Sequence, residues 1–129
     1  MALQIAVWMD GTEAKLFHVF AEGFDETKVQ SPTHHLHRHP KDDKTRTHNH
    51  PDDQRQFFGA LADALKGAAQ ILILGPSVTK LLFLRYLQKN DPTLESHVVG
   101  METVDHPTDR QIVAHVRHYF QEAATKGQP

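Results

Sequence analysis

The chain has no cysteine, a single tryptophan and no long hydrophobic run. The absence of cysteine excludes disulfides, thiolate metal sites and cysteine nucleophiles, and it is typical of proteins of a reducing cytoplasm. The first residues lack a basic stretch and reach Asp10 early, so we expect no signal peptide. No apolar segment approaches the length needed to cross a bilayer. We therefore expect a cytoplasmic protein without a membrane partner.

The chain has no large excess of either charge, since it has 14 Lys and Arg residues and 16 Asp and Glu residues and its formal net charge is −2. The chain as a whole is therefore not a polycation that would attach to nucleic acid through its net charge. Its 129 residues are enough for one domain with one core. We expect that domain to span residues 1–124, with a histidine-rich loop at 31–51 and a flexible tail at 125–129.

The hydrophobic pattern predicts an α/β protein. Short apolar and β-branched runs indicate strands, and Asp10-Gly11 between the first two is a strong hairpin signal. Apolar residues at helical spacing indicate three helices later in the chain. The order β-β-β-α-β-α-β-α predicts a three-layer mixed sheet with a leading antiparallel hairpin meander and helices packed on it. The expected strands are 3–9, 14–20, 24–30, 70–74 and 98–104, and the expected helices are 51–66, 78–89 and 107 onward.

Six of the eleven histidines fall in one polar segment, residues 31–51. Several occupy every second position, so in an extended chain their imidazoles point to the same side. Imidazole nitrogen suits zinc, nickel and copper, and nearby aspartates could act as oxygen ligands. The alternative is a solvated loop whose metal affinity is incidental. The candidate metal ligands are His34, His35, His37, His39, His48 and His50.

The same segment is basic, because four cationic residues outweigh Asp42 and Asp43 and give residues 31–51 a formal charge of +2. Protonation of histidines, whose free pKa is about 6.5, adds positive charge in mild acid. A basic loop with flat imidazoles can contact phosphates and stack on unpaired bases. The alternative is that the charges only keep the loop soluble. The candidate RNA-binding residues are Arg38, Lys41, Lys44 and Arg46, together with Lys80 discussed next.

Two further places could carry chemistry. The stretch from Gly75 to Lys80 predicts a strand, a tight turn and a helix start, which can hold a phosphate with help from Lys80. It is not a Walker A motif, and Ser77 as a helix cap is the structural alternative. Asp10 and Asp105 could serve a metal-dependent hydrolase. The favoured alternative places Asp10 in an Asp-Gly turn and lets Asp105 or Thr108 cap the last helix.

Three stretches resemble the middle domain of the class 1 peptide-chain release factor of eukaryotes and archaea. They are Ile5 to Phe17 at the first hairpin, Ile71 to Lys80 at the strand-to-helix turn, and Val98 to Asp105 near the last strand. The stretch from Glu102 to Asp109 is similar to small bacterial relatives of that domain, known as translational-machinery-like proteins. The resemblance covers residues 3 to 121 and implies a ribonuclease-H-like fold.

In the release factor, the loop after the third strand carries a Gly-Gly-Gln tripeptide that promotes hydrolysis of peptidyl-tRNA. This chain has its histidine segment at that place and contains no Gly-Gly-Gln, and no glycine pair precedes Gln54 or Gln56. The chemistry needs unusual backbone angles beside the glutamine. The resemblance therefore implies the fold and a ribosome or RNA context, and it argues against peptide release.

Three functional hypotheses follow in order of preference. The first is a non-catalytic, translation-associated protein whose histidine segment contacts RNA, tRNA or the ribosome. The second is a module that binds zinc, nickel or copper through the same segment. The third is a metal-dependent hydrolase that uses Asp10 and Asp105. Exposed strand edges of a small sheet also suggest that a homodimer could form.

Overall fold

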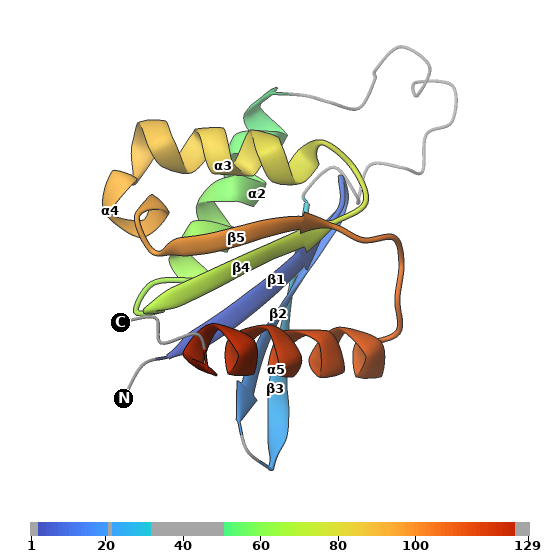
Figure 1. Cartoon of the computed structure of the whole chain (residues 1–129). Coiled ribbons are helices and arrows are strands. Elements are labelled where there is room, and N and C mark those ends of the chain that lie inside the picture. Colours follow the sequence, from blue (N-terminus) through green and yellow to red (C-terminus); the bar gives the residue numbers. More distant parts are fainter. Residues whose placement is uncertain (1–2, 21, 32–50, 126–129) are drawn as a thin grey trace.

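One mixed sheet lies between two layers of helices in the described chain, residues 3–20, 22–31 and 51–125 of a computed structural model (Figure 1). The first three strands form an antiparallel meander, and the first, fourth and fifth run parallel to one another. The strand order is β3-β2-β1-β4-β5. This confirms the predicted α/β fold. The strands are β1 (Gln4–Met9), β2 (Glu13–Phe20), β3 (Gly23–Gln30), β4 (Gln70–Gly75) and β5 (Val98–Thr103).

The helices cover both faces of the sheet. One layer holds α2 (Pro51–Ala64), α3 (Thr79–Asn90) and α4 (Pro92–Glu95), and α5 (Asp109–Thr125) covers the opposite face (Figure 1). The single turn of α4 was not predicted, although Asp91 caps it by accepting a hydrogen bond from Leu94 N at 3.2 Å. None of the helices in these described ranges is long and apolar enough to span a membrane.

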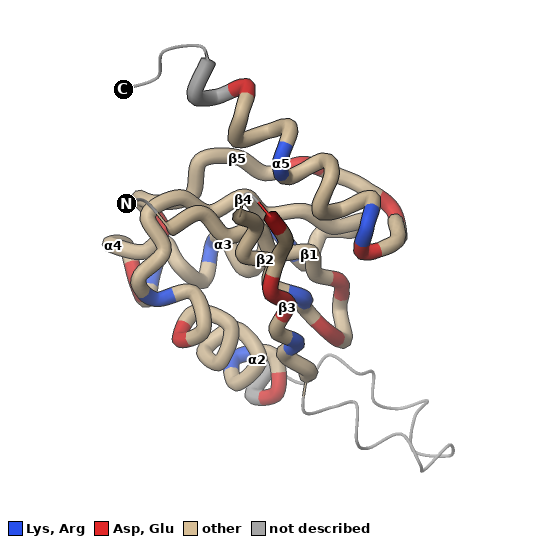
Figure 2. The backbone as a smooth tube through the Cα atoms, turned by 90° about the horizontal axis from the view of Figure 1, so that it is seen from below, with Lys and Arg blue, Asp and Glu red and all other residues tan. Residues whose placement is uncertain are grey.

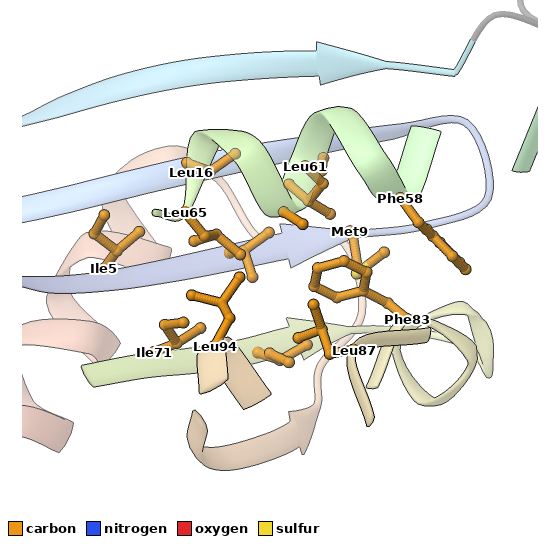
Figure 3. Close-up of a cluster of buried hydrophobic side chains, with 14 of the residues drawn as sticks. Ile5, Met9, Leu16, Phe58, Leu61, Leu65, Ile71, Phe83, Leu87 and Leu94 are labelled. Atoms are coloured by element: carbon orange, nitrogen blue, oxygen red, sulfur yellow. The ribbon is translucent and has the colours of Figure 1, made fainter. Parts of the chain in front are cut away.

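The larger core lies between the sheet and the layer of α2 and α3 (Figure 3). Alternate residues of a strand point to opposite faces, so Ile5, Val7 and Met9 of β1 enter this core. Phe83 of α3 sits at its centre, fully buried, with its ring 5.3 Å from the ring of Phe58 on α2. The two helices and three strands therefore share one hydrophobic interior.

The second core lies under α5, on the other face of the sheet. The apolar stripe of the helix, Ile112, Val113, Val116 and Phe120, packs against the remaining residues of β1 and β4. Trp8 belongs to this core and is only 3% exposed. The single tryptophan thus lies between the sheet and α5, as its position in a buried strand predicts.

The two edge strands of the sheet differ in character. β3 presents charged residues, including Asp25, Glu26 and Lys28, which discourage pairing with another strand. β5 exposes Val99 and Met101, and the start of α3 exposes Leu81 and Leu82 together with the cap residue Val78. These apolar residues belong to the pattern that predicts the helix, yet the buried residues of α3 are Lys80, Phe83 and Leu87. Homodimer formation through an edge stays a prediction.

Candidate functional site

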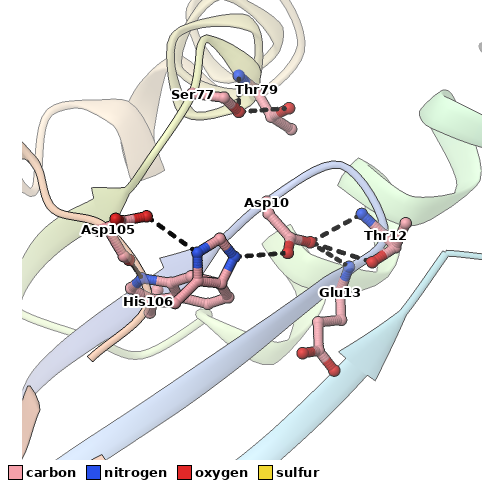
Figure 4. A network of polar contacts seen from close by, with 8 residues as sticks. Asp10, Thr12, Glu13, Ser77, Thr79, Asp105 and His106 are labelled. Atoms are coloured by element: carbon pink, nitrogen blue, oxygen red, sulfur yellow. Dashed lines mark hydrogen bonds and ion pairs between the residues drawn. The ribbon is translucent and has the colours of Figure 1, made fainter. Parts of the chain in front are cut away.

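The carboxyl ends of β1, β4 and β5 meet at one end of the sheet, where three connections lie close together (Figures 1 and 4). They are the β1–β2 turn from Asp10, the β4–α3 turn from Gly75, and the β5–α5 loop from Val104. In open α/β sheets, ligands bind outside the carboxyl ends of parallel strands. This end of the sheet is therefore the candidate site.

Asp10 holds the β1–β2 turn. Its Oδ1 accepts hydrogen bonds from the backbone N of Thr12 at 2.9 Å and of Glu13 at 3.0 Å, and it lies 3.1 Å from Thr12 Oγ1 (Figure 4). This is the Asp-Gly turn favoured from the sequence. Because turn donors already engage Oδ1, only the second carboxylate oxygen faces the site.

His106 occupies the space between Asp10 and Asp105. Its Nδ1 lies 3.0 Å from Asp105 Oδ1, and its Nε2 lies 3.7 Å from Asp10 Oδ2 (Figure 4). The imidazole meets the Trp8 ring edge-on with 5.1 Å between centroids, and Trp8 Nε1 donates to Asp105 O at 2.9 Å. The two aspartates of the hydrolase hypothesis thus flank an imidazole rather than each other.

A pocket of about 350 Å³ opens between the β5–α5 loop and the start of α5. Leu74, Val104 and Ile112 supply apolar walls, and His106 and His115 supply two imidazoles. His115 Nε2 lies 2.5 Å from Glu102 Oε1, which holds that ring in place. The pocket therefore combines an apolar interior with flat rings and polar groups at its rim.

A reciprocal pair of hydrogen bonds caps the N-terminus of α5. Thr108 Oγ1 accepts from Gln111 N at 3.1 Å, and Gln111 Oε1 accepts from Thr108 N at 2.9 Å. This reciprocal arrangement is a capping box. It confirms the expectation that Thr108, one of the two residues considered, caps this helix.

An ion pair anchors the start of α5 to the meander. Lys15 Nζ on β2 lies 3.0 Å from Asp109 Oδ1, and the hydrogen bond lowers the pKa of Asp109 below its ordinary 3.8. Burial by itself lowers the pKa of Lys15, but the hydrogen bond and charge of Asp109 raise it overall above 10.5. Partial desolvation and a hydrogen bond with Asp109 raise the pKa of Glu26 above 4.5.

We expect this ion pair to contribute modestly and in a pH-dependent way to stability. A double-mutant cycle with Lys15→Met and Asp109→Asn should give a coupling of about 0.5–1 kcal/mol in urea unfolding at neutral pH. The folded-state pKa of Asp109 is depressed, so its contribution is present above the unfolded value and lost as pH falls through the folded one. The coupling should vanish well below pH 3.8.

The Lys66–Asp91 pair serves as the matched control, since it is 3.5 Å long and its lysine side chain is 59% exposed, against 20% for Lys15. The same cycle there should give a smaller coupling. Equal couplings at both pairs, or a Lys15–Asp109 coupling unchanged in acid, would contradict the assignment.

The β4–α3 turn is packed tightly against β1. A Cβ at Gly75 would collide with the carbonyl oxygen of Met9, and Gly75 O accepts from Val104 N at 3.0 Å. Lys80 is 8% exposed, and its Nζ donates to Ser77 O at 2.7 Å. Val78, not Ser77, occupies the cap position of α3, although Ser77 Oγ lies 3.4 Å from Thr79 N.

Most of the sequence-predicted site residues lie outside the described residues. These are the six histidines from His34 to His50 and the four cations Arg38, Lys41, Lys44 and Arg46. The segment that holds them leaves the sheet at the candidate site, because Ser31 N donates to Thr12 O at 2.9 Å. α2, which follows the segment, begins at the same end of the sheet (Figure 1). Within the described ranges, no group of three or more His, Asp or Glu could hold a metal ion.

Comparison with solved structures shows that this fold occurs in other proteins. Pelota of Thermoplasma acidophilum matches 86% of the chain with 22% identity and a TM-score of 0.60. Pelota of Archaeoglobus fulgidus matches 97% with 18% identity and a TM-score of 0.60. Dom34 of S. cerevisiae, a translation termination-like factor, matches 96% with 9% identity and a TM-score of 0.52. The chain shares their fold.

These likenesses concern part of each larger protein, since the chain spans 30%, 40% and 38% of the three structures. No protein-family model and no curated protein matches the chain. The shared fold agrees with the α/β fold that the sequence pattern predicts.

The arrangement around His106 was not foreseen from the sequence. Trp8, Asp10 and His106 come from opposite ends of the chain, and no spacing rule relates them. His115 is exposed on α5, and its Nε2 contacts Oε1 of Glu102 on β5. The sequence offered one signal: Trp8, Asp10 and His106 lie near the ends of predicted strands. In a parallel sheet, the carboxyl ends of the strands meet at one edge.

Proposed function

We propose that this chain is a non-catalytic, translation-associated protein that binds RNA, tRNA or the ribosome through residues 31–51. The observation that carries the proposal is the fold shared with Pelota and with Dom34, a factor of RNA quality control that interacts with Hbs1. In this proposal residues 1–124 act as one unit similar to the release-factor middle domain. A cytoplasmic location is part of the same proposal.

The distribution of charge supports a role for this segment. Residues 31–51 hold four of the 14 cationic residues and two of the 16 acidic ones, so the rest of the chain has a formal charge of −4. Figure 2 shows acidic and basic residues interspersed along β3 and the helices rather than gathered in a basic stripe. An RNA strand would therefore be attracted mainly to the segment.

Lys80 contributes to this proposal less directly than the four cations of the segment. Its ammonium is close to Ser77 O, and the side chain would have to leave that carbonyl to reach a phosphate. A phosphate contact by Lys80 stays a prediction.

Binding to single-stranded RNA, measured by fluorescence anisotropy at several salt concentrations, tests the proposal. Four phosphate contacts predict a loss of affinity of roughly fifty-fold between 50 and 200 mM salt. Changing the four cations of the segment to glutamine should weaken binding at low salt and flatten most of this salt dependence. Ribosomes and tRNA should behave in the same way.

The control removes the same amount of charge elsewhere, by changing the exposed Lys28, Arg85, Lys89 and Arg110 to glutamine. It should retain most of the affinity and the salt slope. Absence of salt-sensitive binding by the wild-type protein, or an equal loss in the control, would overturn the proposal.

A second proposed function, binding of zinc, nickel or copper, rests on the alternate spacing of histidines in the same segment. Calorimetric titration with zinc or nickel should show saturable binding by the wild type. A variant with His35, His37, His48 and His50 changed to alanine should lose it. Identical isotherms for the two proteins would contradict metal binding through these histidines.

A further inference from the structure

The pocket at the start of α5 is not used by the contacts proposed for residues 31–51. It is walled by Leu74 and Ile112, which are 1% and 2% exposed, and its volume of about 350 Å³ lies at the small end of the range for ligand pockets. His106 and His115 stand at its rim. Apolar walls beside flat imidazole rings suit a planar heteroaromatic group, on which the rings can stack, better than a highly charged one.

We propose that this pocket takes one unpaired guanine base, and the proposal rests on the RNA binding proposed above. The imidazoles of His106 and His115 would stack on the base or border it, while Ile112 and Leu74 would cover its buried side. Each imidazole is already held by a carboxylate, His106 by Asp105 and His115 by Glu102. The rings are therefore positioned before a base arrives.

The polar groups at the rim favour guanine over the other bases. Asp105 is 92% exposed, and its carboxylate only accepts hydrogen bonds. The Watson–Crick edge of guanine presents donors on two neighbouring atoms, N1 and N2, whereas adenine, cytosine and uracil each present donors on one atom only. Gln111, whose Oε1 is held by Thr108 N, carries N–H donors on its Nε2 that suit a carbonyl oxygen of the base.

The position of the pocket matches the proposed path of the RNA. A series of contacts leads from Ser31, where the basic segment begins, through Thr12 and Asp10 to His106 at the rim. An RNA strand bound by the segment that begins at Ser31 could therefore place a base in the pocket. The acidic rim would repel phosphate but accept hydrogen bonds from the N–H edge of a base. The basic segment would therefore bind the backbone of the RNA strand, and the pocket would bind one of its bases.

The test compares two RNA octamers, one of uridines only and one with a single central guanosine, by anisotropy at fixed salt. The wild type should prefer the guanosine octamer. His106→Ala and His115→Ala should each weaken binding of that octamer roughly tenfold, the size expected for a lost stacking partner. Asp105→Ala should remove the preference while leaving the uridine octamer unaffected. The salt slope should not change in any of the three.

His118→Ala is the matched control, since His118 lies on the same helix, pairs with Glu122 at 3.6 Å and does not line the pocket. It should bind like the wild type. If the wild type binds RNA with the expected salt dependence but the pocket variants match the control, the guanine site is overturned and the proposed function stands.

A second measurement tests the guanine site in the case that the wild-type protein binds no RNA. Guanosine is titrated into the wild-type protein while the imidazole NMR signals of His106 and His115 and the fluorescence of Trp8 are followed. Saturable changes that uridine does not produce, and that His106→Ala abolishes at His115, support the pocket even if no RNA binds. The absence of such changes overturns it.

Discussion

Gly75→Ala is expected to lower the free energy of unfolding by about 3 kcal/mol or more, at the upper end of the range for overpacking. A Cβ at this position would meet the carbonyl oxygen of Met9. The obstacle is backbone, and β1 and β4 are paired in register up to Trp8 and Leu74, so neither strand can move aside without losing sheet hydrogen bonds. Urea unfolding followed by Trp8 fluorescence measures the loss.

Gly11→Ala provides the control at the same end of the sheet. A Cβ there would lie 3.8 Å from Thr79 Oγ1, an ordinary van der Waals contact. Its effect on unfolding should therefore be small. If the free energy of unfolding of Gly75→Ala stayed within about 1 kcal/mol of the wild-type value, the close approach of β4 to β1 would be contradicted. Because Gly75 O also accepts from Val104 N, the variant should disturb the β5–α5 loop and the pocket beneath it.

Phe83→Ala is expected to cost about 3–5 kcal/mol, the range for removing a fully buried phenylalanine. The ring lies 5.3 Å from that of Phe58 and stacks with Tyr86 at 6.4 Å, so its loss leaves a cavity between α3 and α2. Urea unfolding should show the reduced stability. Hydrogen exchange should also show faster opening of α2, because part of its packing surface is gone.

Phe24→Ala is the comparison, since Phe24 is 38% exposed on β3 and its ring lies 6.1 Å from that of Phe17. It should cost at least about 2 kcal/mol less than Phe83→Ala. Comparable losses in the two variants would contradict the central position of Phe83. The comparison bears on function because α2 follows the histidine segment, so loosening α2 would loosen one of the two ends that hold that segment.

Much of the fold could be predicted from local patterns. The Asp10-Gly11 turn, the alternation along β2 and the stripe of Ile112, Val116 and Phe120 each lie within a short stretch, and each pattern has one favoured structure. The order of elements along the chain and the leading meander were predicted, whereas the place of β1 between β2 and β4 in the sheet was not. The α3 helix was predicted, but its apolar residues lie on several sides and did not reveal which ones are buried.

The candidate site could be predicted only in pieces. Asp10 and Asp105 were recognised as residues at strand ends, and the sequence suggested them as a pair of metal ligands. In the structure His106 lies between them and contacts Trp8, because β1 and β5 are separated by β4 and their following loops converge above it. This convergence depends on how loops from distant parts of the chain are positioned relative to one another. No local sequence pattern predicts that.

The sequence by itself determined the class of the fold, the order of its elements and the concentration of positive charge and histidine in one segment, because these depend on residue spacing and composition. Only the tertiary structure decided that this segment starts beside Asp10, that His106 is held between two carboxylates, and that a pocket opens under the β5–α5 loop. These features arise from contacts between residues about 20 to 100 positions apart, which form only when the parallel strands bring their carboxyl ends to one edge.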